Sequence, residues 1–288
     1  MQDFEGRTAV ITGAASGMGL AMAECFAREG MNVVLADVEK GALREAAARI
    51  EALGASALAV PTDVSDEAEM DHLGEATREA YGSVDVLCLN AGVAGGAGPA
   101  ESLTTKDWKW ALDVNVYGII HGIRVFLGDM RARDQGEIVI TASVAGLTSF
   151  PGTLAYNTSK HAAVTIAESL FSELAETGSK VRVHCLCPGL VATNIHTSAR
   201  NRPKELTNDG QPPPTEEQLA ALASLFDSMT ANAKVPEEVA ELVLAAIVEG
   251  RFWIQTDEFF QQAIRERHRS IEEQTDPPAR GNVLAVYV

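Results

Sequence analysis

A glycine-rich turn close to the start of the chain restricts the folds that this sequence can adopt. The turn lies between an apolar strand and a helix. Residues 7–12 are apolar and β-branched, which predicts a short buried strand. The turn from Thr12 to Gly19 reads TGAASGMG, and a helical run follows it to Glu29. A second strand is predicted at 32–37 and ends on Asp37, eighteen residues after Gly19. Strand, glycine turn, helix, strand and acid in this order predict a dinucleotide-binding βαβ unit rather than a plain strand-to-helix connection.

Each glycine of the turn has a separate expected use. Gly13 permits a tight turn, Gly17 lets the backbone approach a pyrophosphate, and Gly19 lets the helix pack close to the sheet. The unpaired N–H groups at the start of the helix would then face the pyrophosphate.

Asp37 favours NAD over NADP. A carboxylate at the end of the second strand accepts hydrogen bonds from both adenine-ribose hydroxyls and repels a 2′-phosphate, which normally needs a basic residue nearby. Residues 14–16 contain no basic residue, and Val38 follows Asp37 directly. Lys40 is the nearest cation along the chain, and we expect it to be solvated at the start of the next helix.

Ser143, Tyr156 and Lys160 form the second informative pattern. Residues i and i+4 share one face of a helix, so Lys160 is expected beside Tyr156. A nearby ammonium lowers a tyrosine pKa from its usual ~10, and work near neutral pH needs a drop of roughly 3 units. With Ser143 at the end of a preceding strand, the three side chains predict proton transfer to an alcohol or a carbonyl. Tyr-x-x-x-Lys alone is typical of an ordinary amphipathic helix; the glycine turn makes the catalytic interpretation the better one.

With both patterns present, the chain resembles the short-chain dehydrogenase/reductase family from Phe4 to about Thr193. The resemblance implies a Rossmann-type fold and reversible hydride transfer between NAD and a secondary alcohol or ketone. Leu89 replaces the asparagine that is more usual before the asparagine-alanine-glycine motif. The shared motifs, in the family's order, are Thr12 to Gly19, Asp63-Val64, Asn90-Ala91-Gly92, Asn115, Ser143, Tyr156 with Lys160, and Pro188-Gly189 with Thr193.

The resemblance also implies the role of each catalytic residue. Tyr156 is the general acid/base, and Lys160 holds the nicotinamide ribose and lowers the tyrosine pKa. Ser143 orients the substrate oxygen. Asn115 interrupts its helix and holds a water that relays protons from Lys160.

The implied cofactor site extends along the whole dinucleotide. Asp63 and Val64 border the adenine, although Asp63 could instead cap the next helix. Asn90 shapes the pocket floor or simply caps its strand. Thr193 and the backbone at Val191 hold the carboxamide. The complete expected set is Gly13, Ser16, Gly17, Met18, Gly19, Asp37, Asp63, Val64, Asn90, Tyr156, Lys160, Pro188, Gly189, Val191 and Thr193.

Three loops are expected to select the substrate, at 93–98, 144–150 and from 190 to about 232. They carry mostly apolar side chains and few charges near the tyrosine, which predicts an apolar or aromatic secondary alcohol or ketone. The alternative is that these side chains only pack the loops. The expected pocket residues are Val93, Val144, Leu147, Phe150, Leu190 and Ile195.

The third loop is long enough to predict a substrate lid at about 190–232, with a helix at 216–229. His196 either faces the pocket or is structural. Arg200 and Arg202 are expected in a solvated basic patch rather than on a substrate anion.

After the last expected strand at 251–256, an extension at about 257–288 replaces the family's glycine-rich ending. It carries a helix at 258–274 and either docks on a neighbouring subunit or extends the pocket wall.

The periodicity along all 288 residues predicts one α/β domain: a single doubly wound Rossmann-type fold, with a parallel sheet of about seven strands and helices on both faces. Strands are expected at 7–12, 32–37, 56–61, 84–90, 136–142, 180–187 and 251–256. Helices are expected at 17–30, 39–53, 66–81, 104–133, 156–177 and 236–249. The helices at 104–133 and 156–177 carry broad apolar faces, which form either monomer core or a subunit interface. The family resemblance implies a homodimer or homotetramer paired through these two helices.

Composition excludes several classes of function. No apolar run approaches the roughly 20 residues of a membrane span, and no signal peptide is evident, so a cytoplasmic location is expected. The four cysteines are expected to be buried thiols in a reducing compartment, without metal-site spacing. A net charge of -17 argues against nucleic acid and anionic membranes as partners.

Among functions, a non-catalytic NAD-sensing module remains the alternative to an enzyme. An NAD-dependent epimerase is disfavoured because the chain lacks an extended nucleotide-sugar domain.

Overall fold

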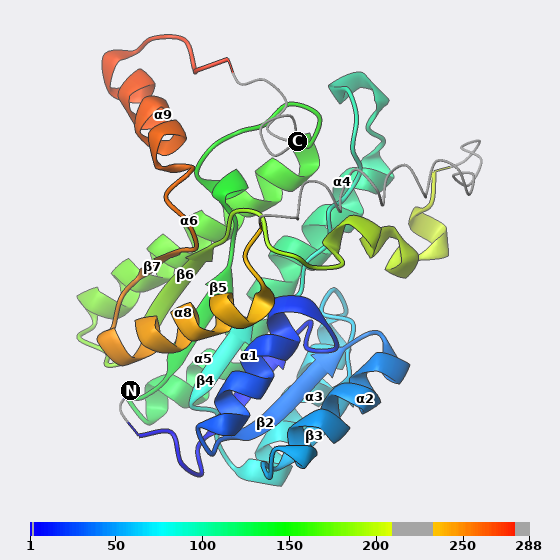
Figure 1. The fold of residues 1–288 in the computed structure, drawn as a ribbon, viewed down its shortest axis with the longest axis vertical. Coiled ribbons are helices and arrows are strands. Elements are labelled where there is room, and N and C mark those ends of the chain that lie inside the picture. Colours follow the sequence, from blue (N-terminus) through cyan, green and yellow to red (C-terminus); the bar gives the residue numbers. More distant parts are fainter. Residues whose placement is uncertain (2, 209–232, 280–288) are drawn as a thin grey trace.

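The computed structural model describes residues 1, 3–208 and 233–279, and it contains a single parallel sheet. The strand order is β3-β2-β1-β4-β5-β6-β7 (Figure 1). Most of the strands are buried on both faces, which is why they are almost continuously apolar in sequence. Their bounds are β1 Thr8–Thr12, β2 Asn32–Asp37, β3 Ala57–Pro61, β4 Val86–Leu89, β5 Glu137–Thr141, β6 Arg182–Cys187 and β7 Trp253–Gln255.

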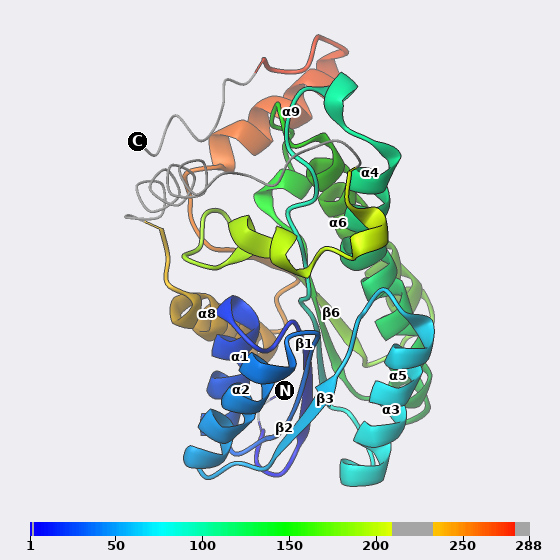
Figure 2. The same ribbon diagram turned by 90° about the vertical axis from the view of Figure 1, so that its right-hand side faces the viewer.

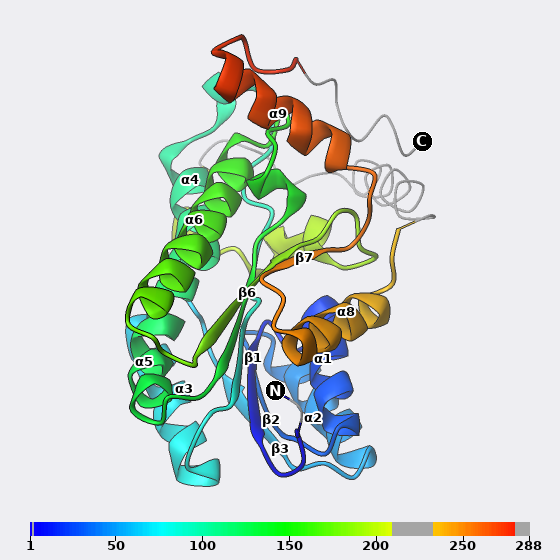
Figure 3. The ribbon, with the colours of Figure 1, turned by 90° about the vertical axis from the view of Figure 1, so that its left-hand side faces the viewer.

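Helices cover both faces of the sheet (Figures 2 and 3). On one face lie α1 (Gly17–Arg28), α2 (Lys40–Ala52) and α8 (Pro236–Glu249), which bury a core that includes Phe26 and Ile247. On the other lie α3 (Glu67–Tyr81), α5 (Gly118–Ala132) and α6 (Leu154–Glu176), around Phe126 and Leu170. The doubly wound α/β fold expected from the sequence is therefore confirmed.

The site is positioned by the point where the strand order reverses. β1 pairs with β2 on one side and with β4 on the other. The connections from these strands run in opposite directions, which opens a crevice at their carboxyl ends. The glycine turn follows β1 and Asn90 follows β4, so both lie at this crevice.

The helix interruption that the family resemblance implies at Asn115 is present. The helix expected over 104–133 consists of α4 (Thr105–Leu112), a π-helical turn (Asp113–Tyr117) and α5. Asn115 lies in the π turn, and its buried side chain hydrogen-bonds the backbone of Val93. The apolar residues keep helical spacing through this turn, so periodicity alone predicts one continuous helix. The other predicted helices and strands of the described residues agree to within about three residues.

The C-terminal extension contains α9 (Gln261–Glu273), inside the helix expected at 258–274. The helix expected at 216–229 lies outside the described residues, as do the last nine residues of the extension. All four cysteines are buried free thiols. No helix within the described ranges has both the length and the hydrophobicity that a bilayer crossing requires. Over the same ranges, no group of three or more metal-ligating side chains is present.

Candidate active site

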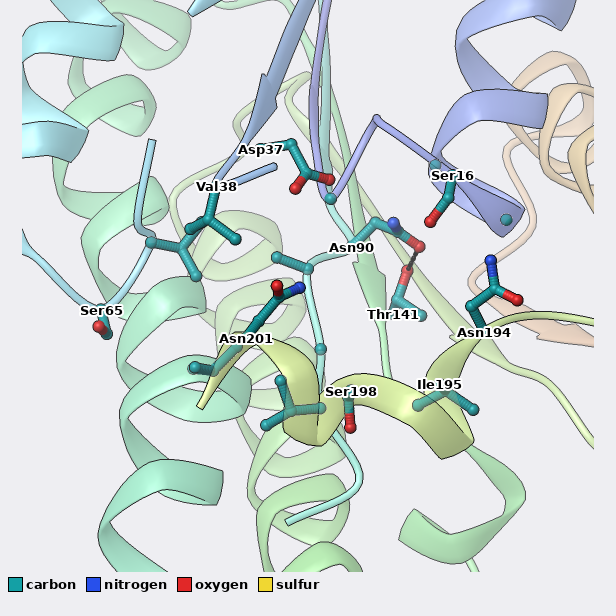
Figure 4. Close-up of a pocket in the computed structure, with 18 of the residues that line it drawn as sticks. Ser16, Asp37, Val38, Ser65, Asn90, Thr141, Asn194, Ile195, Ser198 and Asn201 are labelled. Atoms are coloured by element: carbon teal, nitrogen blue, oxygen red, sulfur yellow. Dashed lines mark hydrogen bonds between the residues drawn. The ribbon is translucent and has the colours of Figure 1, made fainter. Parts of the chain in front are cut away.

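Thr12 and Asn90 join the carboxyl ends of three strands and form the floor of the crevice. The Thr12 hydroxyl accepts hydrogen bonds from the backbone N–H groups of Asn90 (2.9 Å) and Ala91 (3.1 Å). The Asn90 amide donates to the Thr12 carbonyl (3.0 Å), and its oxygen accepts from Thr141 at the end of β5 (3.3 Å; Figure 4). Asn90 therefore connects β1, β4 and β5 and does more than cap its own strand.

The glycine turn has the backbone that a pyrophosphate site needs. Gly13 and Gly17 have φ values of +67° and +54°, a region that favours glycine. A Cβ on Gly19 would lie 2.1 Å from the Gly13 carbonyl oxygen. The Ser16 side chain makes no capping hydrogen bond, and the first turn of α1 carries no acidic residue. The N–H groups at this helix end are thus available to an anion.

Asp37 lies at the end of β2, on the wall of the same cavity. One carboxylate oxygen accepts from the Ala15 N–H (3.0 Å) and the other from the Glu39 N–H (3.0 Å). These bonds fix the carboxylate beside the glycine turn. The nearest cation along the chain, Lys40, is exposed at the start of α2, as expected.

One cavity collects most of the expected cofactor residues. Gly189 and Val191 are not on its wall: Gly189 packs against Asp257 and Phe260, and Val191 belongs to the core. Asp63 does not cap α3, because Asp66 is the N-cap. The expected residues that line the cavity are Gly13, Ser16, Gly17, Met18, Gly19, Asp37, Asp63, Val64, Asn90, Tyr156, Lys160, Pro188 and Thr193.

Tyr156 and Lys160 line this cavity, whereas Ser143 is buried and is not on its wall. The Ser143 hydroxyl accepts from the Ala145 N–H (3.1 Å) and donates to the Pro188 carbonyl (3.4 Å), and it lies close enough to the Tyr156 hydroxyl to lower the tyrosine pKa. The Lys160 ammonium lies 5.7 Å from the centroid of the Tyr156 ring and donates to the Thr141 carbonyl (2.9 Å). Lys160 is only 2% exposed, so its charge is held in place by protein atoms.

The direction of the tyrosine pKa shift differs from the one expected. Burial raises the pKa of Tyr156 above its ordinary value, and the hydrogen bond from Ser143 offsets this only partly. Burial also lowers the pKa of Lys160 to about 8, since a buried ammonium loses its hydration. The expectation considered the lysine charge alone, whereas desolvation of both groups is the larger effect in this structure.

Asn115 is fully buried and held by three hydrogen bonds. Its side-chain oxygen accepts from the Val93 N–H (2.8 Å), and its amide donates to the Val93 carbonyl and to the Ser159 hydroxyl (both 2.9 Å). The side chain thereby fixes the loop that follows β4. The proton relay through a water stays a prediction.

The expected substrate residues separate into two groups. Val93 and Ile195 line the cavity. Val144 and Leu147 do not; they are 8% and 7% exposed and belong to the packing beneath Ser143, as the alternative interpretation held. Phe150 and Leu190 are not on the cavity wall either, and Phe150 packs edge-to-face on Phe260, with ring centroids 6.2 Å apart.

Two arginines expected in a solvated patch make specific ion pairs instead. Arg202 contacts Asp107 (2.7 Å) and lies over the Trp110 ring (5.2 Å). Arg200 contacts Glu39 across the cavity (2.5 Å). The short helix that carries Arg200, Ile195–Asn201, lies opposite Asn90 in Figure 4. No local pattern predicts these ion pairs, because the two residues of each pair lie about a hundred or more positions apart in the sequence.

Several contributing residues had no individual motif. Ser198 accepts from the Ala94 N–H (3.1 Å) and so joins the 195–201 helix to the loop after β4. Thr256 accepts from the Gly189 N–H (3.0 Å). Thr12 was recognisable only as part of the glycine turn. Such hydroxyl groups are common in loops, so only their tertiary partners distinguish them.

The comparisons with known proteins agree with this geometry. The family described as short chain dehydrogenase matches residues 7–204. A dehydrogenase/reductase of CLA biosynthesis from Lactiplantibacillus plantarum is 30% identical over 272 residues, which is 94% of this chain and 95% of that protein. A 1-deoxy-11-beta-hydroxypentalenate dehydrogenase from Streptomyces exfoliatus is 39% identical over 189 residues, 65% of this chain and 68% of that protein.

A solved structure is similar over nearly the whole chain. It is a short chain dehydrogenase/reductase from Burkholderia phymatum in complex with NAD, 42% identical, with a TM-score of 0.91 and coverage of 98% of this chain and 100% of that one. With the family match, the site geometry and these relatives in agreement, the chain belongs to the short chain dehydrogenase family of oxidoreductases.

Proposed function

We propose that the protein catalyses the reversible, NAD-dependent oxidation of an apolar or aromatic secondary alcohol to a ketone. The observation that carries the proposal is that one cavity is lined by the glycine turn, Asp37, Tyr156 and Lys160. A proton-transfer group placed in a dinucleotide cavity is what an alcohol dehydrogenase requires.

The chain's own residues would bind the cofactor and move the proton. The turn and the start of α1 hold the pyrophosphate, and Asp37 holds the adenine ribose. NAD, when bound, supplies the two-electron acceptor. Tyr156 takes the hydroxyl proton during oxidation and returns it during reduction. Ser143 would orient the substrate oxygen, and the Lys160 ammonium, 5.7 Å from the centroid of the tyrosine ring, would oppose the effect of burial by favouring the tyrosinate.

The identity of the substrate rests on the apolar side chains near Tyr156. Val93 and Ile195 line the cavity together with Trp110 and Leu206, while Phe150 and Phe260 pack on each other outside its lining. Preference for NAD rests on Asp37 and on the similarity to the Burkholderia phymatum protein. The homodimer or homotetramer, the lid and the cytoplasmic location stay predictions.

The variant Tyr156→Phe tests the proposal against the NAD-sensing alternative. It should lose alcohol oxidation by about 10²–10⁴-fold, the usual contribution of a general acid/base, because the phenol is removed. NAD binding, followed by fluorescence titration, should stay within a few-fold of the unmodified protein. Tyr117→Phe is the matched control, since Tyr117 is 51% exposed on α5's N-terminal side. NAD binding without turnover by the unmodified protein, on any of a panel of secondary alcohols, would favour the sensor.

A further inference from the structure

An ion pair between Glu39 and Arg200, which are 161 residues apart, lies on the cavity wall beside Asp37. A single carboxylate oxygen of Glu39 accepts from the Arg200 guanidinium (Nε 3.1 Å, Nη2 2.5 Å) and from the Asn201 amide (2.9 Å). Glu39, Arg200 and Asn201 all line the cavity together with Asp37. Figure 4 places Asn201 on the side of the cavity that faces Val38.

Glu39 is tied to the residue that would hold the adenine ribose. Its backbone N–H donates to the carboxylate of Asp37 (3.0 Å), so the two acidic residues occupy one turn at the end of β2. The Arg200 guanidinium is steadied from its own helix by the Thr197 hydroxyl (2.9 Å) and the Asn194 carbonyl (3.3 Å). Hydrogen bonding from Arg200 holds the pKa of Glu39 below its ordinary value, so the carboxylate stays charged at neutral pH.

We infer that Glu39 is a second determinant of cofactor specificity, which acts by occupying the only guanidinium that lines this cavity among the described residues. The inference rests on the proposed dinucleotide site. Arginine is the preferred protein ligand for a phosphate because its guanidinium donates two parallel hydrogen bonds. Here those donors already bind a carboxylate, and two carboxylates at the ribose edge would repel a 2′-phosphate.

It follows that the site contains a guanidinium able to bind a 2′-phosphate, and that Glu39 occupies it. Removing the Glu39 charge would do two things together. It would take one negative charge from the ribose edge, and it would release the Arg200 guanidinium, which its own helix keeps at the cavity wall.

The test compares 5′-AMP with adenosine 2′,5′-bisphosphate, which report on the adenosine half of the site without any turnover. In Glu39→Gln, calorimetric titration should find the bisphosphate bound about tenfold more tightly than by the unmodified protein, as expected for a gained charge-assisted hydrogen bond. The affinity for 5′-AMP should change much less. Glu39→Ala should also bind the bisphosphate more tightly than the unmodified protein does. This second variant is needed because the glutamine of Glu39→Gln could still hydrogen-bond Arg200.

The double variant Glu39→Gln/Arg200→Gln isolates the guanidinium. It should lose most of the gain in bisphosphate affinity; a gain of the same size would overturn the inference, as would no gain in either single variant. Asp71→Asn is the matched control, because it breaks an exposed pair with Arg124 (2.8 Å) on the α3–α5 surface. If neither probe binds the unmodified protein, the dinucleotide site itself is wrong, and the inference fails with it.

Discussion

Gly19 lies where any side chain would collide with the turn that precedes it. A Cβ there would meet the Gly13 carbonyl oxygen at 2.1 Å and the Asn90 amide at 2.8 Å. Both contacts belong to the floor of the cavity, so α1 would have to move away from the sheet. At the residue scale, Gly19 therefore tolerates no side chain, even though it lies in the first turn of α1 and alanine is otherwise the favoured residue in helices.

Gly19→Ala should accordingly destabilise the fold by about 1–3 kcal/mol, the usual cost of forcing extra volume into a packed site. It should also weaken NAD binding, because the N–H groups of α1 would shift. Urea unfolding and fluorescence titration measure the two effects. Gly41→Ala in α2 is the control: nothing lies within 4 Å of its added Cβ, so unfolding should be unchanged or slightly harder. Equal behaviour of the two variants would contradict the packing argument.

At the element scale, β5, β6 and the loop before β7 are joined by a buried charge cluster away from the cavity. Glu137 on β5 is 4% exposed and pairs with Arg182 and His184 of β6. His184 lies 2.9 Å from that carboxylate and 2.7 Å from the Arg251 carbonyl. His184 therefore links the Glu137 carboxylate to the segment that precedes β7. The Met1 amino group also lies 3.2 Å from Glu137.

Glu137→Gln should destabilise the protein by about 3–5 kcal/mol at pH 7, because it removes the buried carboxylate with which Arg182 pairs. Burial alone would raise the pKa of Glu137, but hydrogen bonds from His184 and Arg182 hold it below its ordinary value. Its contribution is therefore present above pH ~4.5 and is lost as the pH falls through the lowered pKa. Urea unfolding between pH 7 and pH 3 measures this. Glu249→Gln, which breaks an exposed pair with Arg251, should change stability by under about 1 kcal/mol.

At the scale of the whole molecule, residues 195–208 are attached to both sides of the cavity. Arg200 reaches Glu39 beyond β2, while Arg202 and Asn208 contact Asp107 of α4. Hydrogen bonds from Thr104, Arg202 and Asn208 outweigh burial and keep the pKa of Asp107 below its ordinary value. Residues 195–208 are thus attached by ion pairs at two separate places.

Arg202→Gln should release the α4 side of this segment. Amide hydrogen exchange over residues 195–208, followed by mass spectrometry, should become faster by about tenfold, while exchange in the strands stays the same. The substitution removes an ion pair in which both side chains are largely buried, at 13% and 4% exposure. Lys204→Gln makes the same charge change in the same segment, at an exposed side chain, and should leave exchange unaltered. Unchanged exchange in Arg202→Gln would show that the segment does not depend on this attachment.

The sequence predicted the elements best where a local cause was sufficient. The strand ends, the glycine turn and the i, i+4 placement of Tyr156 and Lys160 follow from side-chain patterns a few residues long. Apolar periodicity predicted one continuous helix at 104–133, and only the family resemblance indicated its interruption at Asn115, where the side chain hydrogen-bonds Val93, twenty-two residues away. The tyrosine pKa was predicted in the wrong direction because its burial depends on the whole fold.

By itself, the sequence determined the family, the doubly wound sheet and the residues that meet at the carboxyl ends of the strands, since each depends on local periodicity and motif spacing. Only the tertiary structure decided the electrostatics of the cavity. It buried Lys160 and Tyr156, and it brought Arg200 to Glu39 at the adenosine end, where the neighbouring sequence contains no arginine. Desolvation and long-range ion pairs depend on which distant segments come together, and no local pattern in the chain encodes that.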